Sequence, residues 1–156
     1  MTALPSFADS TAVFSRPADF VPQVGANAPV TDPYVVHAYQ YATSAAPETV
    51  QPAVVIVPGD KFADSVPAPQ RRETMIKDVQ AAVKYAYKRK IAVALRSGGH
   101  SFSGYSSCKD ENIQLDMKHF NRVHWSNDMK RLTAGTGTFL QDLDKAMFEH
   151  EAFLPH

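Results

Sequence analysis

The sequence predicts an α+β fold built around a βαβ unit. Residues 53–57 read Ala-Val-Val-Ile-Val between Pro52 and Pro58. A short, wholly apolar run between chain breakers is typical of a strand buried on both faces. In residues 72–90, apolar side chains recur every three or four positions, which predicts an amphipathic helix with a basic C-terminal end. Residues 91–95 form a second apolar run, so we expect a right-handed strand–helix–strand crossover.

Weaker patterns predict the other elements. Prolines and the absence of periodicity in residues 1–33 predict an irregular arm that wraps the domain or stays mobile. Residues 34–41 are rich in Tyr and Val, and this composition favours an extended segment. Residues 112–115 and 123–125 are further strand candidates, and residues 131–134 lead into Gly-Thr-Gly-Thr at 135–138. A helix follows them, with Thr138 and Gln141 at the spacing of a capping box.

Composition excludes several classes of function. The chain of 156 residues has 16 basic and 16 acidic side chains, so net charge gives no reason to expect binding to nucleic acid or to an anionic membrane. Its apolar runs are too short to span a bilayer, and the N-terminus does not resemble a signal peptide, so cytoplasmic and secreted locations both stay open. Cys108 is the only cysteine, which excludes an internal disulfide.

Five of the six histidines, all except His100, show no spacing that argues for a metal site. We expect structural or surface roles for all of them, and we expect Cys108 to be an incidental loop thiol. These histidines are His37, His119, His124, His150 and His156.

The loop after the second strand carries the clearest chemistry. Residues 96–101 read Arg-Ser-Gly-Gly-His-Ser, and glycines and hydroxyls continue to Ser107. Glycines let successive backbone N–H groups turn toward one point, which suits a phosphate-bearing ligand. The loop lacks the Gly-x-Gly-x-x-Gly pattern that opens a helix, so it is not a Rossmann dinucleotide site. A histidine in such a loop places a nucleophilic nitrogen beside the ligand.

Several segments, in the same order along the chain, resemble the vanillyl-alcohol oxidase flavoprotein superfamily. They are residues 52–58, the helix that follows, residues 93–101, Asn-Ile-Gln-Leu-Asp-Met at 112–117, Leu-Thr-Ala-Gly-Thr at 132–136, and Phe-Leu-Pro-His at 153–156. The pattern is most similar to the berberine-bridge-enzyme-like and carbohydrate-oxidase branch, whose FAD domain is called PCMH-type. The resemblance covers about residues 34–156.

The resemblance implies FAD as the cofactor. His100 matches the histidine that many members bond to the flavin 8α-methyl group; a loop histidine beside noncovalent FAD, or with no flavin, is the alternative. The loop at 96–101 would wrap the pyrophosphate, and a later glycine turn would bring backbone close to the flavin. The positions that the resemblance assigns to cofactor binding are Arg96, Ser97, Gly98, Gly99, His100, Ser101, Gly104, Tyr105, Ser106, Gly135 and Thr136.

The resemblance also indicates what the chain lacks. We expect a proline-rich arm at 1–33 and, at 34–156, only the N-terminal, βαβ-containing part of a PCMH-type domain. The small-molecule substrate site, the catalytic base and the cysteine of bicovalent members would then lie beyond it. The implied activity is oxidation of an alcohol, sugar or amine-type carbon, with O₂ as acceptor. The alternative is an inactive fragment that acts as a binding or assembly module, needing a complementary C-terminal half.

Overall fold

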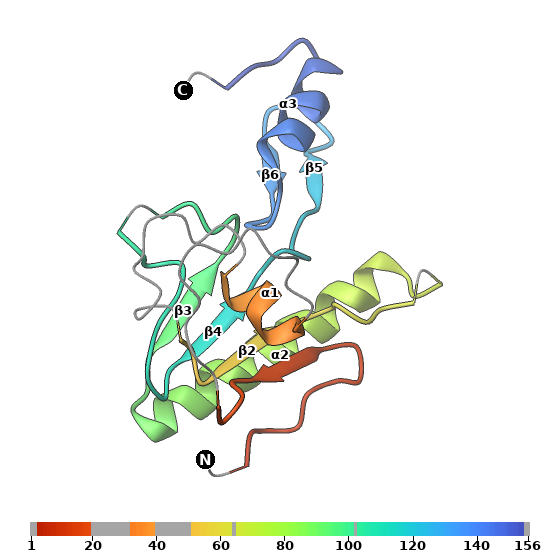
Figure 1. The fold of residues 1–156 in the computed structure, drawn as a ribbon. Helices are drawn as coiled ribbons and strands as arrows, with labels where there is room; N and C mark the ends of the chain where they lie inside the picture. Colours follow the sequence, from red (N-terminus) through yellow and green to blue (C-terminus); the bar gives the residue numbers. More distant parts are fainter. Residues whose placement is uncertain (1–2, 20–31, 40–50, 64, 102, 155–156) are drawn as a thin grey trace.

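A four-stranded sheet forms the centre of the molecule. The computed structural model describes residues 3–19, 32–39, 51–63, 65–101 and 103–154. In spatial order the strands are β1 (Ala12–Ser15), β2 (Val54–Val57), β4 (Ile113–Asp116) and β3 (Val93–Arg96). Strands β2, β4 and β3 are parallel, and β1 pairs antiparallel with β2 at one edge (Figure 1). The carboxyl ends of three strands therefore meet at the same end of the sheet.

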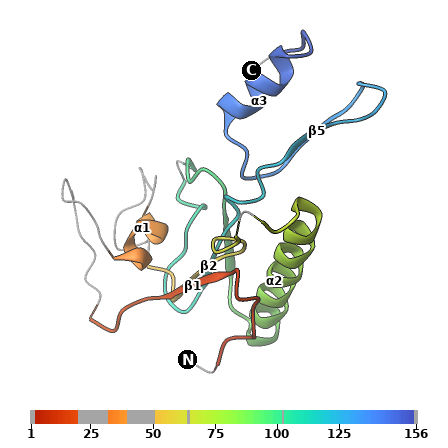
Figure 2. The ribbon, with the colours of Figure 1, turned by 90° about the vertical axis from the view of Figure 1, so that its right-hand side faces the viewer.

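Strand β2 is buried on both faces, as its sequence predicts. Val54 and Ile56 pack with residues of helix α2 (Ala68–Arg89). Val55 and Val57 pack on the opposite side, with residues of β1 and of helix α1 (Pro33–Tyr39). Because side chains alternate along a strand, four consecutive apolar residues supply two cores at once. The two helices accordingly lie on opposite faces of the sheet (Figure 2).

Helix α2 confirms the predicted crossover from β2 to β3, with β4 lying between these two strands. The helix begins at Ala68, earlier than the expected residue 72. Pro67 is its N-cap and Pro69 lies in its first turn, where a missing N–H costs nothing. It ends in Lys88 and Arg89, followed by Lys90 in the left-handed conformation (φ 55°). Within the described part of the chain, no helix combines the length and apolarity needed to cross a membrane.

The expected extended segment at 34–41 is wrong: residues 33–39 form α1, while residues 40 and 41 lie outside the described part. The Asp32 carboxylate accepts the Tyr34 N–H at 2.8 Å, and Pro33 opens the first turn. An Asp N-cap followed by proline is a strong helix start, and it outweighs the β-propensity of the Tyr and Val side chains. Tyr34 and Ala38 then anchor the helix in the second core.

Strand β1 also departs from the expectation, because residues 12–15 of the proline-rich arm are regular. Ala12 lies opposite Val57 and Ser15 opposite Val54 in the ladder. The strand is four residues long, too short for alternation to be visible in the sequence. It exists because β2 offers it an edge and a core position for Ala12. Residues 20–31 of the arm lie outside the described part.

A smaller lobe follows the sheet. Strands β5 (Val123–Trp125) and β6 (Leu132–Ala134) pair antiparallel, and helix α3 (Leu140–Phe148) follows them (Figure 1). Trp125 Nε1 donates to the Ala146 carbonyl at 3.1 Å and ties the hairpin to the helix. The expected capping box is wrong: Phe139 is the N-cap and makes no side-chain cap, and Thr138 Oγ1 is buried without a partner among the described residues.

Candidate functional site

The candidate site lies where the three parallel strands end. Strand β2 runs into Pro58, β3 into the glycine-rich loop at 97–106, and β4 into Met117. Open parallel sheets bind ligands at the carboxyl ends of their strands, because the loops there project together. The loop at 97–106, called the glycine loop below, therefore occupies the position that the fold favours for a ligand. Phe102 within it lies outside the described residues.

The start of the glycine loop has backbone donors for which the described part of the chain offers no acceptor. Among the described residues, the N–H groups of Ser97, Gly98 and Gly99 make no hydrogen bond. Gly99 is nevertheless buried and has φ +74°, which a side chain rarely allows. A buried residue whose amide has no partner, as at Gly99, is rare in folded proteins, whereas Ser97 is exposed and Gly98 is half-buried. An anionic ligand that accepts these N–H groups would satisfy them, so this segment fits a phosphate-bearing cofactor.

His100 lies close beside these glycines. A Cβ built on Gly98 would approach the imidazole Cδ2 to 2.7 Å, so only glycine lets the ring lie as it does. The His100 side chain is exposed, as is that of Tyr105. An exposed imidazole next to open amides can meet a ligand that the loop holds. The His100 ring therefore lies beside the first three residues of the loop.

The second half of the loop is a tight turn. Gly104, at φ +74°, donates its N–H to the Ser101 carbonyl at 3.0 Å, and the Tyr105 N–H donates to Ser101 Oγ at 3.3 Å. Ser101 thus accepts two bonds from its own loop, and its hydroxyl donates to none of the described residues. Ser106 is half-buried in the segment that leads back toward β4. Ser101, Gly104 and Tyr105 shape the loop through these contacts.

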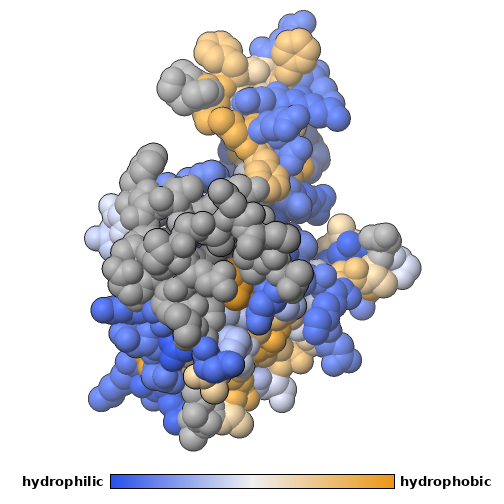
Figure 3. All heavy atoms as spheres, viewed as in Figure 1, coloured by the Kyte–Doolittle hydropathy of each residue, from blue (hydrophilic) through white to orange (hydrophobic). Residues whose placement is uncertain are grey.

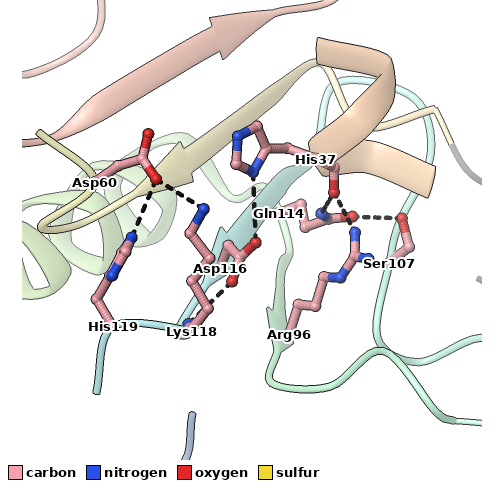
Figure 4. Close-up of polar contacts among 8 residues, drawn as sticks. All are labelled: His37, Asp60, Arg96, Ser107, Gln114, Asp116, Lys118 and His119. Carbon is pink, nitrogen blue, oxygen red and sulfur yellow. Dashed lines mark hydrogen bonds and ion pairs between the residues drawn. The ribbon is translucent and has the colours of Figure 1, made fainter. Parts of the chain in front are cut away.

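The Arg96 side chain has a different environment from the loop that follows it. Its guanidinium is buried and donates to the main-chain carbonyl of His37 in α1 (Figure 4). Gln114 Nε2 donates to the same carbonyl at 2.9 Å, and Ser107 Oγ donates to Gln114 Oε1 at 2.7 Å. Sequence reasoning missed this cluster because the His37 carbonyl lies 59 residues before Arg96 and 77 before Gln114.

Gly135 and Thr136, also predicted as cofactor residues, lie in the turn after β6. A Cβ on Gly135 would come within 1.9 Å of the Phe120 carbonyl oxygen. Gly137, which sequence reasoning missed, would meet the Met117 carbonyl at 2.4 Å in the same way. Both glycine N–H groups also bond to this neighbouring segment, Gly135 to Arg122 and Gly137 to Phe120, each at 2.9 Å. Gly135 and Gly137, the crossing glycines, therefore let the turn after β6 cross the segment after β4 in direct backbone contact.

A charged cluster lies at the ends of β2 and β4 (Figure 4). Asp60 Oδ1 pairs with Lys118 Nζ at 2.7 Å and with His119 Nε2 at 3.0 Å. Burial alone would raise the pKa of Asp60, but hydrogen bonds from Lys118 and His119 outweigh it, so the pKa lies below its usual value. His119 is thus a structural histidine, as expected. The only sequence signal for the cluster is that each member follows a strand.

Cys108 is a half-buried thiol close to the end of the glycine loop. Burial raises its pKa to about 12. A thiol with such a pKa is almost wholly protonated at neutral pH and is therefore a poor nucleophile. This agrees with the expected incidental role.

Comparison with known proteins agrees with this geometry. The FAD binding domain family matches residues 72–156, which contain the glycine loop, the crossing glycines and α3. The D-lactate dehydrogenase of Archaeoglobus fulgidus is 32% identical over 80 residues, covering 51% of this chain and 18% of that protein. The (R)-6-hydroxynicotine oxidase of Paenarthrobacter nicotinovorans is 35% identical over 68 residues, covering 44% of this chain and 15% of that protein.

A solved structure of berberine bridge enzyme from Eschscholzia californica shares the fold, with a TM-score of 0.57 at 20% identity. The alignment covers 89% of this chain and 24% of that structure. The chain thus spans less than a fifth of the two curated relatives and about a quarter of the structural neighbour. The family match at residues 72–156 covers more than half of the chain. The chain therefore belongs to the FAD-binding domain family of PCMH type, and its cofactor is FAD.

Proposed function

We propose that the glycine loop holds the FAD pyrophosphate, through the N–H groups of Ser97, Gly98 and Gly99. The observation that carries this proposal is the set of three neighbouring amides without an acceptor among the described residues, at the carboxyl end of a parallel strand. Backbone donors bind phosphate oxygens without the desolvation cost of a buried cation. The Ser97 and Ser101 hydroxyls are further donors for the same phosphates.

The second part of the proposal is that His100 attaches the flavin covalently. A ring nitrogen would form a bond to the 8α-methyl carbon, which loses a hydrogen. The two electrons would reduce the flavin, and O₂ would then take them up, together with the proton from the methyl group and the proton from the imidazole, as H₂O₂. Exposure of the His100 ring beside the open amides supports this role. Attachment would hold the cofactor in place while the loop positions its phosphates.

The activity proposed for the whole enzyme is oxidation of an alcohol, sugar or amine-type carbon. When bound, the FAD would supply a hydride acceptor for the substrate carbon, with O₂ as the final acceptor that gives H₂O₂. This chain contributes cofactor binding, and we assign none of its residues as the catalytic base. The nicotine oxidase and lactate dehydrogenase relatives support oxidation of a carbon that bears nitrogen or oxygen, without selecting between them.

An absorption spectrum followed by acid precipitation tests this proposal. If His100 binds flavin covalently, yellow colour stays with the precipitated chain, and His100→Ala releases it into the supernatant. His124→Ala is the matched control, because His124 is an exposed histidine of β5, away from the glycine loop. Colour lost from the wild-type precipitate would limit the proposal to noncovalent FAD. A chain that takes up no flavin at all would contradict it.

A second candidate function is an assembly module without turnover. Exposed aromatic residues of the α3 lobe favour it: Phe148 is 85% exposed and Phe153 is 82% exposed. Apolar patches of this kind usually mark a surface that another protein covers. Mixing this chain with a complementary C-terminal half distinguishes the two candidate functions. Oxidase activity of the mixture would support the oxidase function, whereas binding of the two halves without turnover would support the assembly module.

A further inference from the structure

Both ends of the glycine loop are connected to one backbone oxygen. Arg96, directly before the loop, donates to the His37 carbonyl. Ser107, directly after it, donates to Gln114 Oε1 at 2.7 Å, and the Nε2 of the same amide donates to the His37 carbonyl at 2.9 Å (Figure 4). The loop is thus closed by a chain of three hydrogen bonds that passes through helix α1. No motif in the sequence marks this connection, because His37 precedes Arg96 by 59 residues and Gln114 by 77.

The His37 carbonyl can accept two donors because of its position in α1. It belongs to the last turn of a seven-residue helix, where carbonyls lack an intrahelical partner. A guanidinium there also interacts favourably with the negative end of the helix dipole. A helix this short is marginal by itself, so its position depends on such tertiary bonds. Arg96 and Gln114 therefore cap α1 while they hold the loop.

Burial makes these bonds hard to break. The Gln114 side chain is completely buried and Arg96 is 3% exposed, so water cannot replace a lost partner. The ring of His37 is held separately: it stacks on Phe14 with centroids 4.6 Å apart, and its Nδ1 lies 3.7 Å from Asp116 Oδ2. The oxygen that receives both donors is therefore fixed relative to the sheet.

We propose that Ser107 and Gln114 are positioning residues for the FAD-binding loop, and that docking of α1 and binding of FAD are coupled through the His37 carbonyl. The inference rests on the proposed function of the glycine loop. Neither residue needs to touch the cofactor: together with Arg96 they keep the two ends of the loop at a fixed separation. A loop already held in its binding shape loses less conformational entropy when the ligand arrives. Because coupling is reciprocal, bound FAD also stabilises the docked position of α1.

The first test uses the chain without FAD. In Ser107→Ala, we expect amide hydrogen exchange of residues 103–107 to be about fivefold faster, the factor that corresponds to one lost hydrogen bond. Ser107→Thr keeps the hydroxyl and should restore the wild-type rate. Thr11→Val is the matched control, because it removes a buried hydroxyl bond to Asp78 on α2, at 2.5 Å, away from the loop. It should lower the unfolding midpoint without changing exchange in the loop.

The second test measures FAD affinity by quenching of flavin fluorescence. We expect Ser107→Ala to raise the Kd about fivefold and Gln114→Met, which removes both bonds of the amide, to raise it further. Ser107→Thr and Thr11→Val should bind like the wild type. In the wild type, FAD should slow exchange of the α1 amides at residues 34–39.

The two arms separate this inference from the proposed function. If the wild-type chain does not bind FAD, the proposed function fails, while the exchange experiment still reports whether Ser107 holds the loop. If FAD binds but exchange and affinity in Ser107→Ala match the wild type, the positioning role is wrong. Equal effects of Ser107→Ala and Thr11→Val on the loop would also overturn it, because they would reflect global stability alone.

Discussion

The sheet with its two helices and the lobe formed by β5, β6 and α3 differ in how they bury their apolar side chains. Every residue of β2 and β4 is buried, whereas Met147 is the only buried hydrophobic residue among the described positions from 118 onward. Phe139, Leu140, Phe148 and Phe153 of the lobe are exposed. Figure 3 shows apolar side chains on the surface of the lobe. The sheet is thus held by its own core, and the lobe depends on local contacts at the crossing glycines.

The largest expected difference concerns core truncation. Ile56→Ala should lower the free energy of unfolding by about 2–5 kcal/mol, because the side chain is fully buried and its loss leaves a cavity. Leu140→Ala, at a 53% exposed position in the lobe, should change it by less than about 1 kcal/mol. Urea denaturation followed by circular dichroism measures both. Similar losses in the two variants would show that the lobe shares the core's stability.

The crossing glycines give the next largest effect. Gly135→Ala places a methyl group 1.9 Å from the Phe120 carbonyl oxygen, so the two backbones must separate. We expect a loss of about 1–3 kcal/mol and faster proteolysis of the lobe than of the sheet. Thr136→Ala, at the exposed position between the two glycines, is the control and should behave like the wild type. Proteolysis of the sheet and the lobe at equal rates would contradict the claim that contacts at the crossing glycines hold the lobe in place independently of the core of the sheet.

A smaller, pH-dependent effect is expected at Asp60. Its pKa is lowered in the folded state, so the unfolded chain binds a proton more readily and the carboxylate favours folding above its usual pKa of 3.8. This contribution should fade as the pH falls below about 4. Asp60→Asn should cost at most about 1 kcal/mol at pH 7, since the pair is partly exposed, and the difference from the wild type should vanish near pH 2. Unfolding midpoints across this range provide the measurement; a constant difference would contradict the assignment.

The sequence predicted the parts of the molecule whose signals are local. The apolar runs of β2 and β3 and the stripe of α2 each lie within one segment, and the glycine loop is visible as one stretch. Strand β1 was missed because a strand of four residues is formed only through pairing with its neighbour β2. Helix α1 was predicted as an extended segment because the β-propensity of its Tyr and Val side chains hid the signal of the Asp-Pro helix start. The connection from Ser107 through Gln114 to His37 joins residues far apart in the chain, so only the fold brings it into view.

The central claim is that the amides of the glycine loop bind FAD, and equilibrium titration tests it most directly. The wild-type chain should quench flavin fluorescence to saturation at one FAD per chain. Gly99→Ala should raise the Kd about tenfold or more, because a Cβ at φ +74° forces this part of the loop to change shape. Unfolding midpoints should confirm that the variant is folded. A wild-type chain that does not bind FAD, or a Gly99→Ala chain that binds it equally well, would contradict the account.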